Sequence, residues 1–389
     1  GGVPNIPFRD LAIQKRENDL VGATFGRSFY VFDDYTPLRR VSEEMLEQQV
    51  ELFPVRDAWW YIPRRPFGDD GPSDQGAAFF TAPNPPFGAV FTYYLKEELE
   101  TQKQSRQKKE KEIAKEGGDT PFPGWDVLQA EEEEEKAEIV LTVRDEAGDV
   151  VRRIAGPAGS GFHRVAWDLH YPTTNAVTSL EPAESWMPDD GPLAPPGRYT
   201  VTLAQRVGGE LSPLAEPQGF EVKRMREGTL PGSSPEETLA FTRELAEINR
   251  QVDGAGKILD QTAERLQLIK HALMKSTVND ALLDDEARAL EQKVFELRGA
   301  LRGNKRQEDI GEPMPHTIGR RLSAASIGTM LSTYGPTPTH RQTLAIAQEE
   351  LEEVKQGLKQ LLQVDLPAFE DQLEAAGVPW TPGRGVPGT

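Results

Sequence analysis

Cysteine is absent from this sequence, and no apolar run approaches the ~18 residues of a membrane-spanning helix. The first absence excludes disulfide scaffolds and thiolate metal sites, and the second excludes a membrane span within these residues. Positive charge is also scarce, because 44 Lys and Arg face 63 Asp and Glu, for a net charge of -19. Such a charge repels phosphate backbones and anionic lipids, so we expect no nucleic-acid partner.

Catalytic motifs are missing as well. The sequence has no HExxH, GxSxG, Walker or Rossmann fingerprint, and its five histidines are not spaced as zinc ligands. Glycoside hydrolysis needs two carboxyl groups facing each other about 5 to 9.5 Å apart, whereas neighbours on a strand point to opposite faces. We therefore predict no catalytic residue, cofactor or metal site in this chain, although a carboxylate pair across domains stays open. The adjacent acids are Asp33 and Asp34, Asp69 and Asp70, and Asp189 and Asp190.

The chain opens with an apolar ribbon. In "DLAIQKRENDLVGATFGRSFYVFDDY", residues 10–35, two apolar segments flank the polar turn "KREND". This pattern predicts two β-strands, the second covering residues 20–32. A two-stranded ribbon has two open edges and is marginal alone. We expect it to complete a sheet with strands from elsewhere.

Residues 37–76 look like a connector, because Pro and Gly interrupt them repeatedly. Trp59, Trp60 and Tyr61 nevertheless argue against a free linker. Buried aromatic side chains are far commoner than ligand platforms, so we expect these three to hold the segment between two domains. A platform on which a glycan stacks is the alternative.

Residues 77–226 have an all-β pattern that predicts a two-sheet sandwich. A charged insertion, residues 96–137, interrupts it and has too few apolar residues to bury a helix face. We expect a helical arm in solvent, with the glutamates of residues 131–135 solvated; a calcium site would need ligands spaced around a loop. The candidate strands are "AAFFTA", "GAVFTYYL", "EIVLTVRD", "DVVRRIAG", "HRVAWDL", "GRYTVTLAQ" and "GFEVKR".

Residues 234–376 change to a helical period and predict an antiparallel three-helix bundle, followed by a tail at residues 377–389. Ser234, Pro235 and Glu237 predict the first helix start, and Thr339 with Gln342 the third. The long connection between the second and third helices predicts a short helix at residues 323–332 and is the expected place for functional contacts. Three apolar series at intervals of three and four support the bundle: Leu245, Ile248, Val252, Ala255, Leu259, Thr262, Leu266, Ile269 and Leu273; Leu283, Ala287, Leu290, Val294, Leu297 and Leu301; and Leu344, Ala347, Leu351, Val354, Leu358 and Leu361.

The N-terminal ribbon resembles the closing strands of the β-propeller in large bacterial proteins with bacterial-neuraminidase-type (BNR, Asp-box) repeats, also described as sortilin-like or glycosyl hydrolase. "NPPFGAVFTYYL", "DEAGDVVRRI", "GFHRVAWDL" and "PPGRYTVTL" resemble the C-terminal region of these proteins, similar to the immunoglobulin-like domain of flagellar hook-capping proteins. The family's Gly-Arg-Gly is Gly26, Arg27 and Ser28 here, and no Asp-box or sialidase arginine triad is present. The resemblance rests on Asp10, Ile13, Arg16, Asp19, Leu20, Thr24, Gly26, Arg27, Asp33 and Asp34.

This resemblance implies that residues 1–36 close a propeller blade whose other strands lie upstream, in a secreted or periplasmic protein whose signal also lies upstream. The expected function is non-catalytic: bracing the propeller and binding a protein or glycan. Trp59, Trp60, Tyr61 and Arg27 are the candidate ligand or interface residues. Two alternatives are a rim of a propeller glycoside hydrolase and a structural assembly subunit whose helices pair between protomers. Whether the parent protein is an enzyme stays open.

Overall fold

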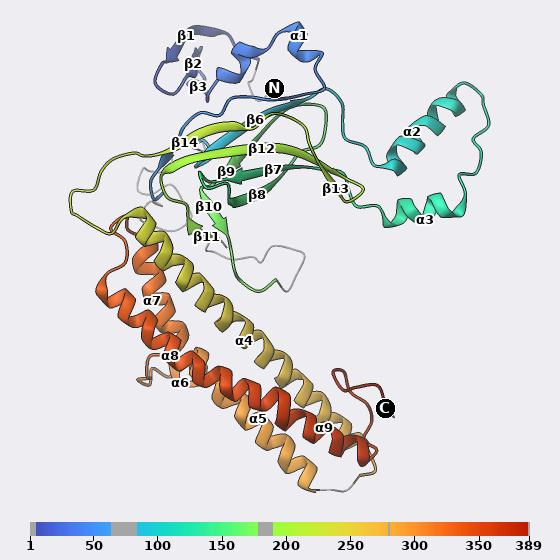
Figure 1. Ribbon diagram of the computed structural model, residues 1–389, viewed down its shortest axis with the longest axis vertical. Helices are drawn as coiled ribbons and strands as arrows, with labels where there is room; N and C mark the ends of the chain where they lie inside the picture. The colour runs from blue at the N-terminus through green and yellow to red at the C-terminus, as the bar shows by residue number, and fades with distance from the viewer. Residues whose placement is uncertain (1–4, 64–83, 178–189, 279–280, 388–389) are drawn as a thin grey trace. The chain divides into compact units, whose positions relative to one another are not determined.

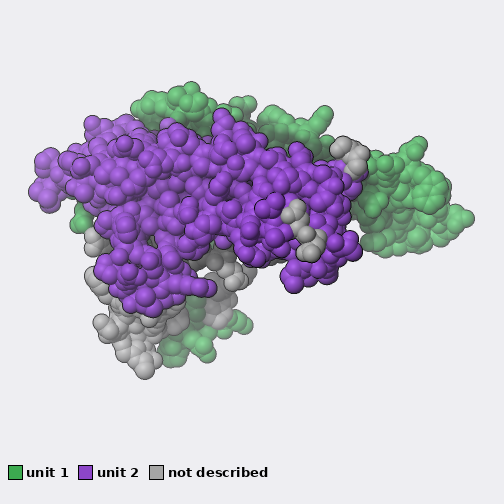
Figure 2. All heavy atoms as spheres, turned by 90° about the horizontal axis from the view of Figure 1, so that it is seen from below, with its two compact units in different colours: residues 1–171, 193–227 green, residues 172–192, 228–389 purple. Residues whose placement is uncertain are grey.

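The computed structural model describes residues 5–63, 84–177, 190–278 and 281–387 (Figure 1). The chain is a mixture of helices and several sheets. It divides into two compact units, coloured separately in Figure 2. The first contains residues 1–171 and 193–227 and holds the N-terminal sheet and the two larger sheets, and the second contains residues 172–192 and 228–389 and is mainly helical.

An N-terminal sheet of three antiparallel strands opens the first unit. It consists of β1 (Phe8–Gln14), β2 (Asp19–Thr24) and β3 (Phe29–Phe32), in the order β1-β2-β3. The prediction of one strand over residues 20–32 is wrong, because the chain reverses between β2 and β3. Gly26 and Ser28 adopt the left-handed backbone region there, with φ of 74° and 64°, which a continuous strand does not permit.

Two further sheets share one hydrophobic core. A six-stranded sheet has the order β5-β14-β12-β7-β8, with β13 beside β12, and a three-stranded sheet has the order β4-β6-β9. Fully buried side chains come from both, among them Phe91 and Trp167 of the smaller sheet and Leu141 and Leu203 of the larger. The strands are β4 (Val50–Leu52), β5 (Ala58–Trp60), β6 (Ala89–Leu95), β7 (Glu138–Arg144), β8 (Val150–Gly156), β9 (Gly161–Trp167), β12 (Gly197–Val207), β13 (Glu210–Pro213) and β14 (Gln218–Arg224), and β10 (His170–Pro172) pairs separately with β11 (Asp190–Leu193).

The segment predicted to be a connector belongs to this fold. After the short helices η1 (Thr36–Arg40) and α1 (Glu43–Leu46), β4 pairs with β6, and β5 runs parallel to β14. These strands have three residues each, too few to show an alternating pattern in the sequence. The expected strand "AAFFTA" lies outside the described residues.

The charged insertion forms two helices, α2 (Gln102–Lys115) and α3 (Trp125–Glu133). Arg106 joins them, since its Nε and Nη2 donate to the two carboxylate oxygens of Glu131 at 2.6 and 2.7 Å. Glu131 is buried, so the expectation that the whole glutamate run is solvated is wrong at this position. The hydrogen bonds from Arg106 hold the pKa of the Glu131 carboxyl below its usual value.

The second unit contains α4 (Pro235–Lys275), α5 (Ala281–Arg302), α6 (Lys305–Asp309), α7 (Ile318–Met330), α8 (Pro338–Gln360), a π-helical turn (Leu361–Asp365) and α9 (Leu366–Ala375). The three predicted apolar series lie on α4, α5 and α8, the last continuing to Leu361 in the π-helical turn, and are buried, except that Val252 and Leu297 are partly exposed. Helix α7 also enters this core through Ile318, Leu322 and Ala325, so it is longer and more central than the short helix predicted at residues 323–332.

The helix starts test two sequence predictions. Ser234 caps α4 in a capping box with Glu237, as predicted. The prediction of Thr339 as the cap of α8 is wrong, because Thr337 takes that position. Pro338 occupies the first helical position, where its missing N–H costs nothing, and this places the start two residues earlier.

The segment predicted as a C-terminal tail packs on the second unit. Val378, Thr381 and Arg384 are buried. Arg384 donates through Nη1 to the carbonyls of Val378 and Pro379 and through Nη2 to Glu374 at 2.6 Å. The long aliphatic stem and forked head of this one arginine therefore fix the turn that follows α9.

Candidate functional site

The N-terminal sheet exposes large apolar side chains on both faces. Leu11 and Phe29 are 61% and 70% exposed. The register places Ile13, Leu20 and Phe32 on one face and Ala12, Val21 and Val31 on the other. A sheet that belongs to a single solvated layer keeps only one face apolar, so this composition indicates a surface that a further layer or strand covers.

One glycine allows an aromatic ring to pack closely against this sheet. A Cβ added to Gly22 would come within 2.4 Å of Cε1 of Phe8. An irregularity in the β1-β2 register at residues 8–10 brings Phe8 over Gly22, and its ring centroid lies 6.1 Å from that of Tyr30. The aromatic patch on this face therefore depends on the absence of a side chain at position 22.

Both edges of the N-terminal sheet lack a strand partner among the described residues, since β2 is central and pairs with β1 and β3. On β1, the backbone N–H of Leu11 donates to its neighbour Asp10 Oδ1 at 2.9 Å. This bond shows that the Leu11 N–H points away from β2. The Asp10 side chain thus occupies one donor of the outer edge of β1, and the edge has no strand partner among the described residues.

Polar contacts attach the N-terminal sheet to the rest of the first unit. Arg56 Nη1 donates to the carbonyl of Glu17 at 2.7 Å, and Trp59 Nε1 donates to Glu17 Oε1 at 3.4 Å. Arg164 Nη1 donates to the carbonyl of Asp33 at 3.1 Å. Burial, followed by the nearby Asp19 carboxylate, raises the pKa of Asp33. The turn between β1 and β2 is therefore held by side chains that follow it in the sequence.

The three aromatic residues of the predicted site do not all face the same way in the structure. Trp59 and Trp60 are adjacent in β5 and so point to opposite faces of its sheet. Trp60 Nε1 donates to the carbonyl of Ala194 at 2.9 Å, whereas Trp59 turns to Glu17. Tyr61 lies edge-on against Phe87, with 4.9 Å between the ring centroids. Trp60 is therefore separated from the other two rings, whereas Trp59 and Tyr61 remain 38% and 37% exposed.

Arg27, the fourth predicted residue, is exposed in the turn between β2 and β3. The structure places it in the N-terminal sheet and the three aromatic residues on or just after β5, so the four do not form one site. The pattern that sequence reasoning missed is instead the accumulation of exposed apolar side chains on β1 and β3. Their alternation was visible, but only the strand pairing reveals that both faces stay uncovered.

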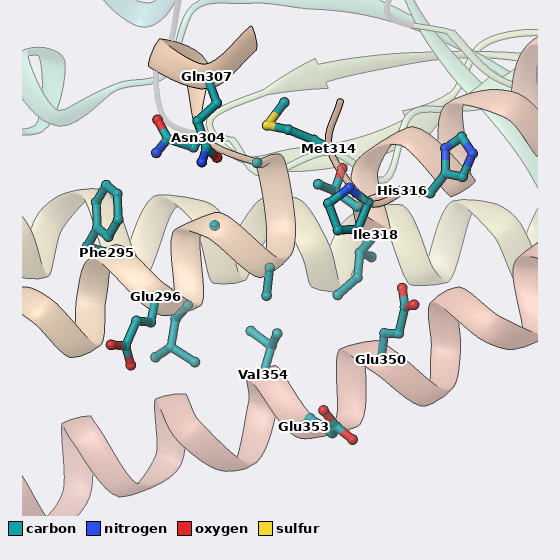
Figure 3. A pocket seen from close by; sticks show the side chains of 16 residues that line it. Phe295, Glu296, Asn304, Gln307, Met314, His316, Ile318, Glu350, Glu353 and Val354 are labelled. Carbon is teal, nitrogen blue, oxygen red and sulfur yellow. The ribbon is translucent and has the colours of Figure 1, made fainter. Parts of the chain in front are cut away.

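The second unit contains a groove of about 680 Å³ that no motif predicted. It lies between α5 and α8 and is bounded by the segment that joins α6 to α7 (Figure 3). Apolar and acidic side chains share its wall, and no lysine or arginine lines it. The connection between the second and third long helices was the expected place for functional contacts, and part of it does line this groove. The labelled lining residues are Phe295, Glu296, Asn304, Gln307, Met314, His316, Ile318, Glu350, Glu353 and Val354.

The carboxylate and imidazole groups of the described residues have the following arrangement. No group of three His, Asp or Glu side chains there is arranged to hold a metal ion. His163 Nε2 lies 2.6 Å from the carbonyl of Gly159, and His170 Nδ1 lies 2.8 Å from that of Asp168, so both rings have local backbone partners. Asp69, Asp70 and Asp189 lie outside the described residues.

None of the described helices combines the length and the apolar composition that crossing a membrane requires. Comparison of the chain with protein-family models, with curated proteins and with solved structures finds no match. The function must therefore be argued from the surfaces described above.

Proposed function

We infer that this chain is a non-catalytic bracing and binding region whose N-terminal sheet is completed by strands of a β-propeller in the same protein. The observation that carries this inference is the N-terminal sheet itself, with unpaired edges among the described residues and exposed apolar side chains on both faces. The resemblance of this ribbon to the closing strands of BNR-type propellers supports the same assignment. The same resemblance supports a secreted or periplasmic location for the parent protein.

Unpaired edges favour strand addition as the mode of binding. The outer edge of β1 runs over seven residues and presents backbone donors and acceptors that no described residue of another strand satisfies. An incoming strand gains affinity from these hydrogen bonds and specificity from the alternate side chains. A propeller blade is a small antiparallel sheet of this kind, in which β1, β2 and β3 take neighbouring positions.

The attachment of the N-terminal sheet explains how bracing works. Arg56 and Arg164 bind backbone carbonyls at the ends of the sheet and come from segments that belong to the two larger sheets of the first unit. A force on the N-terminal sheet is transmitted through these hydrogen bonds to the hydrophobic core that the two larger sheets share. Because Trp59 and Trp60 point to opposite faces of their sheet, the three predicted aromatic residues do not act together, which favours a strand over a glycan as the partner of this region.

The test converts the outer edge of β1 to a charged one. Leu11→Lys and Ile13→Lys together place two lysines on an exposed strand, a device that blocks strand addition without opening a core. The matched control is Leu211→Lys, since Leu211 is an exposed leucine on β13. The chain and the polypeptide encoded before it are produced separately and mixed, and association is measured by calorimetry.

We expect the wild-type chain and Leu211→Lys to bind the preceding polypeptide alike, and the double lysine variant to bind at least tenfold more weakly. Equal binding by all three proteins contradicts the proposal. The proposal is also wrong if the preceding polypeptide has no propeller repeats.

A further inference from the structure

The groove of the second unit, defined by the residues named in Figure 3, plays no part in strand addition and has the properties of a ligand site. Its volume of about 680 Å³ falls within the range of 300–1,000 Å³ that small-molecule sites occupy. The segment that joins α6 to α7 borders it on one side, and α5 and α8 supply the other walls. A molecule of roughly ten to twenty non-hydrogen atoms fits such a space.

The apolar part of the groove wall indicates that the ligand has a hydrocarbon body. Val354 and Ile318 are buried, Met314 is half-buried, and all three line the groove (Figure 3). Phe295 is 55% exposed although its ring borders the groove. An aromatic ring and a thioether left at the mouth of a hollow are adaptable contact surfaces for an apolar group.

The charged part of the wall has one sign. Glu296 comes from α5, and Glu350 and Glu353 come from α8 (Figure 3). Glu350 is neutralised by Arg321, whose Nε lies 3.0 Å from Oε2. Glu296 accepts only the amide of Gln292 at 2.9 Å, and neither Glu296 nor Glu353 has a cationic partner within the ranges that the structure describes. The groove therefore has uncompensated negative charge beside an apolar wall.

We propose that this groove binds a small organic cation with an apolar body, with its ammonium group toward Glu296 and Glu353 and its body against Phe295 and Met314. Charge complementarity decides the sign of the ligand, because an anion meets like charges and no lysine or arginine. The ring of Phe295 contacts the apolar body of the ligand and adds affinity through the burial of apolar surface. A purely inorganic cation leaves the apolar wall unused.

The experiment measures binding of three probes to the full chain that share an aromatic body and differ in charge. These are 2-phenylethylammonium, neutral 2-phenylethanol and anionic 3-phenylpropanoate. Calorimetry gives the dissociation constants, and the NMR signal of the Met314 methyl group, assigned with Met314→Leu, reports where each probe binds. We expect a dissociation constant of about 0.1–1 mM for the ammonium, at least tenfold weaker binding of the alcohol, and none of the carboxylate.

Three variants locate the two halves of the site. Glu296→Gln and Glu353→Gln are each expected to weaken the ammonium about fivefold, and Phe295→Ala about threefold. The control, Glu264→Gln, makes the same charge change on α4 at an exposed residue outside the lining and is expected to have no effect. All four positions lack buried apolar packing except for the partly covered Phe295 ring, so folding is preserved.

Absence of binding, a Met314 signal that does not move, or equal affinity for all three probes overturns the proposal. So does a loss of affinity in Glu264→Gln as large as that in Glu353→Gln, because it shows a response to net charge alone. None of these results bears on strand addition at the N-terminal sheet.

Discussion

Glu17, in the turn between β1 and β2, is contacted by two arginines whose roles differ. Arg56 reaches it across 39 positions of sequence, with Nη1 2.7 Å from the Glu17 carbonyl and 3.5 Å from its carboxylate. Arg16 is its neighbour in the chain, with Nε 2.8 Å from Oε1 and a side chain that is 78% exposed. Of these two arginines, only Arg56 joins the N-terminal sheet to the larger sheets, from which Trp59 and Arg164 also donate hydrogen bonds to it. We therefore predict that Arg56→Ala loosens the N-terminal sheet and that Arg16→Ala does not.

The magnitude follows from the geometry. A hydrogen bond from a charged donor contributes about 1.5–3 kcal/mol, and the partly exposed pair with the carboxylate adds well under 1 kcal/mol. Because a third of the Arg56 side chain is exposed, we expect the lower end, about 1.5 kcal/mol, or roughly tenfold more frequent opening of the sheet. Removing Arg16, a solvated local pair, should cost about 0.3 kcal/mol, less than a twofold change.

Hydrogen exchange followed by mass spectrometry measures this directly. Peptides that cover β1, β2 and β3 should lose about tenfold protection in Arg56→Ala, and peptides from α4 serve as the internal reference. Equal effects of Arg56→Ala and Arg16→Ala would refute the reasoning. A loss of protection that extends equally to α4 would refute it too, because the contact would then support global and not local stability.

Three further predictions test other parts of the structure. Leu259→Ala should lower the free energy of unfolding of the second unit by about 3 kcal/mol, measured by urea denaturation followed by circular dichroism. Leu268→Ala, on an exposed face of α4, should lower it by under 1 kcal/mol. Equal losses would contradict the burial of Leu259. Ser28→Gly should slow hydrogen exchange in β2 and β3, because the φ of 64° costs serine about 1 kcal/mol of strain that glycine does not have. Faster exchange would show that the serine side chain contributes more to stability than this strain removes. Arg106 lowers the pKa of the Glu131 carboxyl in the folded state. The stabilisation of α2 against α3 is therefore complete above the pKa that Glu131 has in the unfolded state, and it is lost as the pH falls through the pKa of the folded state. Hydrogen exchange of α2 and α3 peptides between pH 6 and 2 should show this loss, and Glu131→Gln should remove the pH dependence.

The helical unit was the most predictable part of the chain. Leu245, Leu290 and Leu351 belong to series with a period that only an amphipathic helix satisfies, and all three are buried in the structure. Ser234 was recognisable because a cap, a proline and a glutamate occupy fixed positions within four residues. The longer strands, such as β7 and β12, were predicted for the same reason, since alternation over seven or more residues is a local signal.

The wrong sequence predictions arose where neighbouring residues carried similar or competing local signals. Residues 25–28 contain phenylalanine and serine beside Gly26, and the apolar residues on both sides hid the reversal between β2 and β3. At the start of α8, Thr337 and Thr339 are equally good caps by composition, and the fixed φ of Pro338 decides between them. The glutamates of residues 131–135 look alike in sequence, and only the approach of Arg106 distinguishes Glu131.

By itself, the sequence determined which segments are helices and long strands and which of their faces are buried, because periodicity depends on neighbours within a few residues. Tertiary structure alone decided that β4 and β5 join the larger sheets, that Trp59 and Trp60 point apart, and that α5 and α8 leave a groove with acidic walls. These features require side chains far apart in sequence to meet. Their free energy depends on the packing of whole elements, which no local pattern encodes.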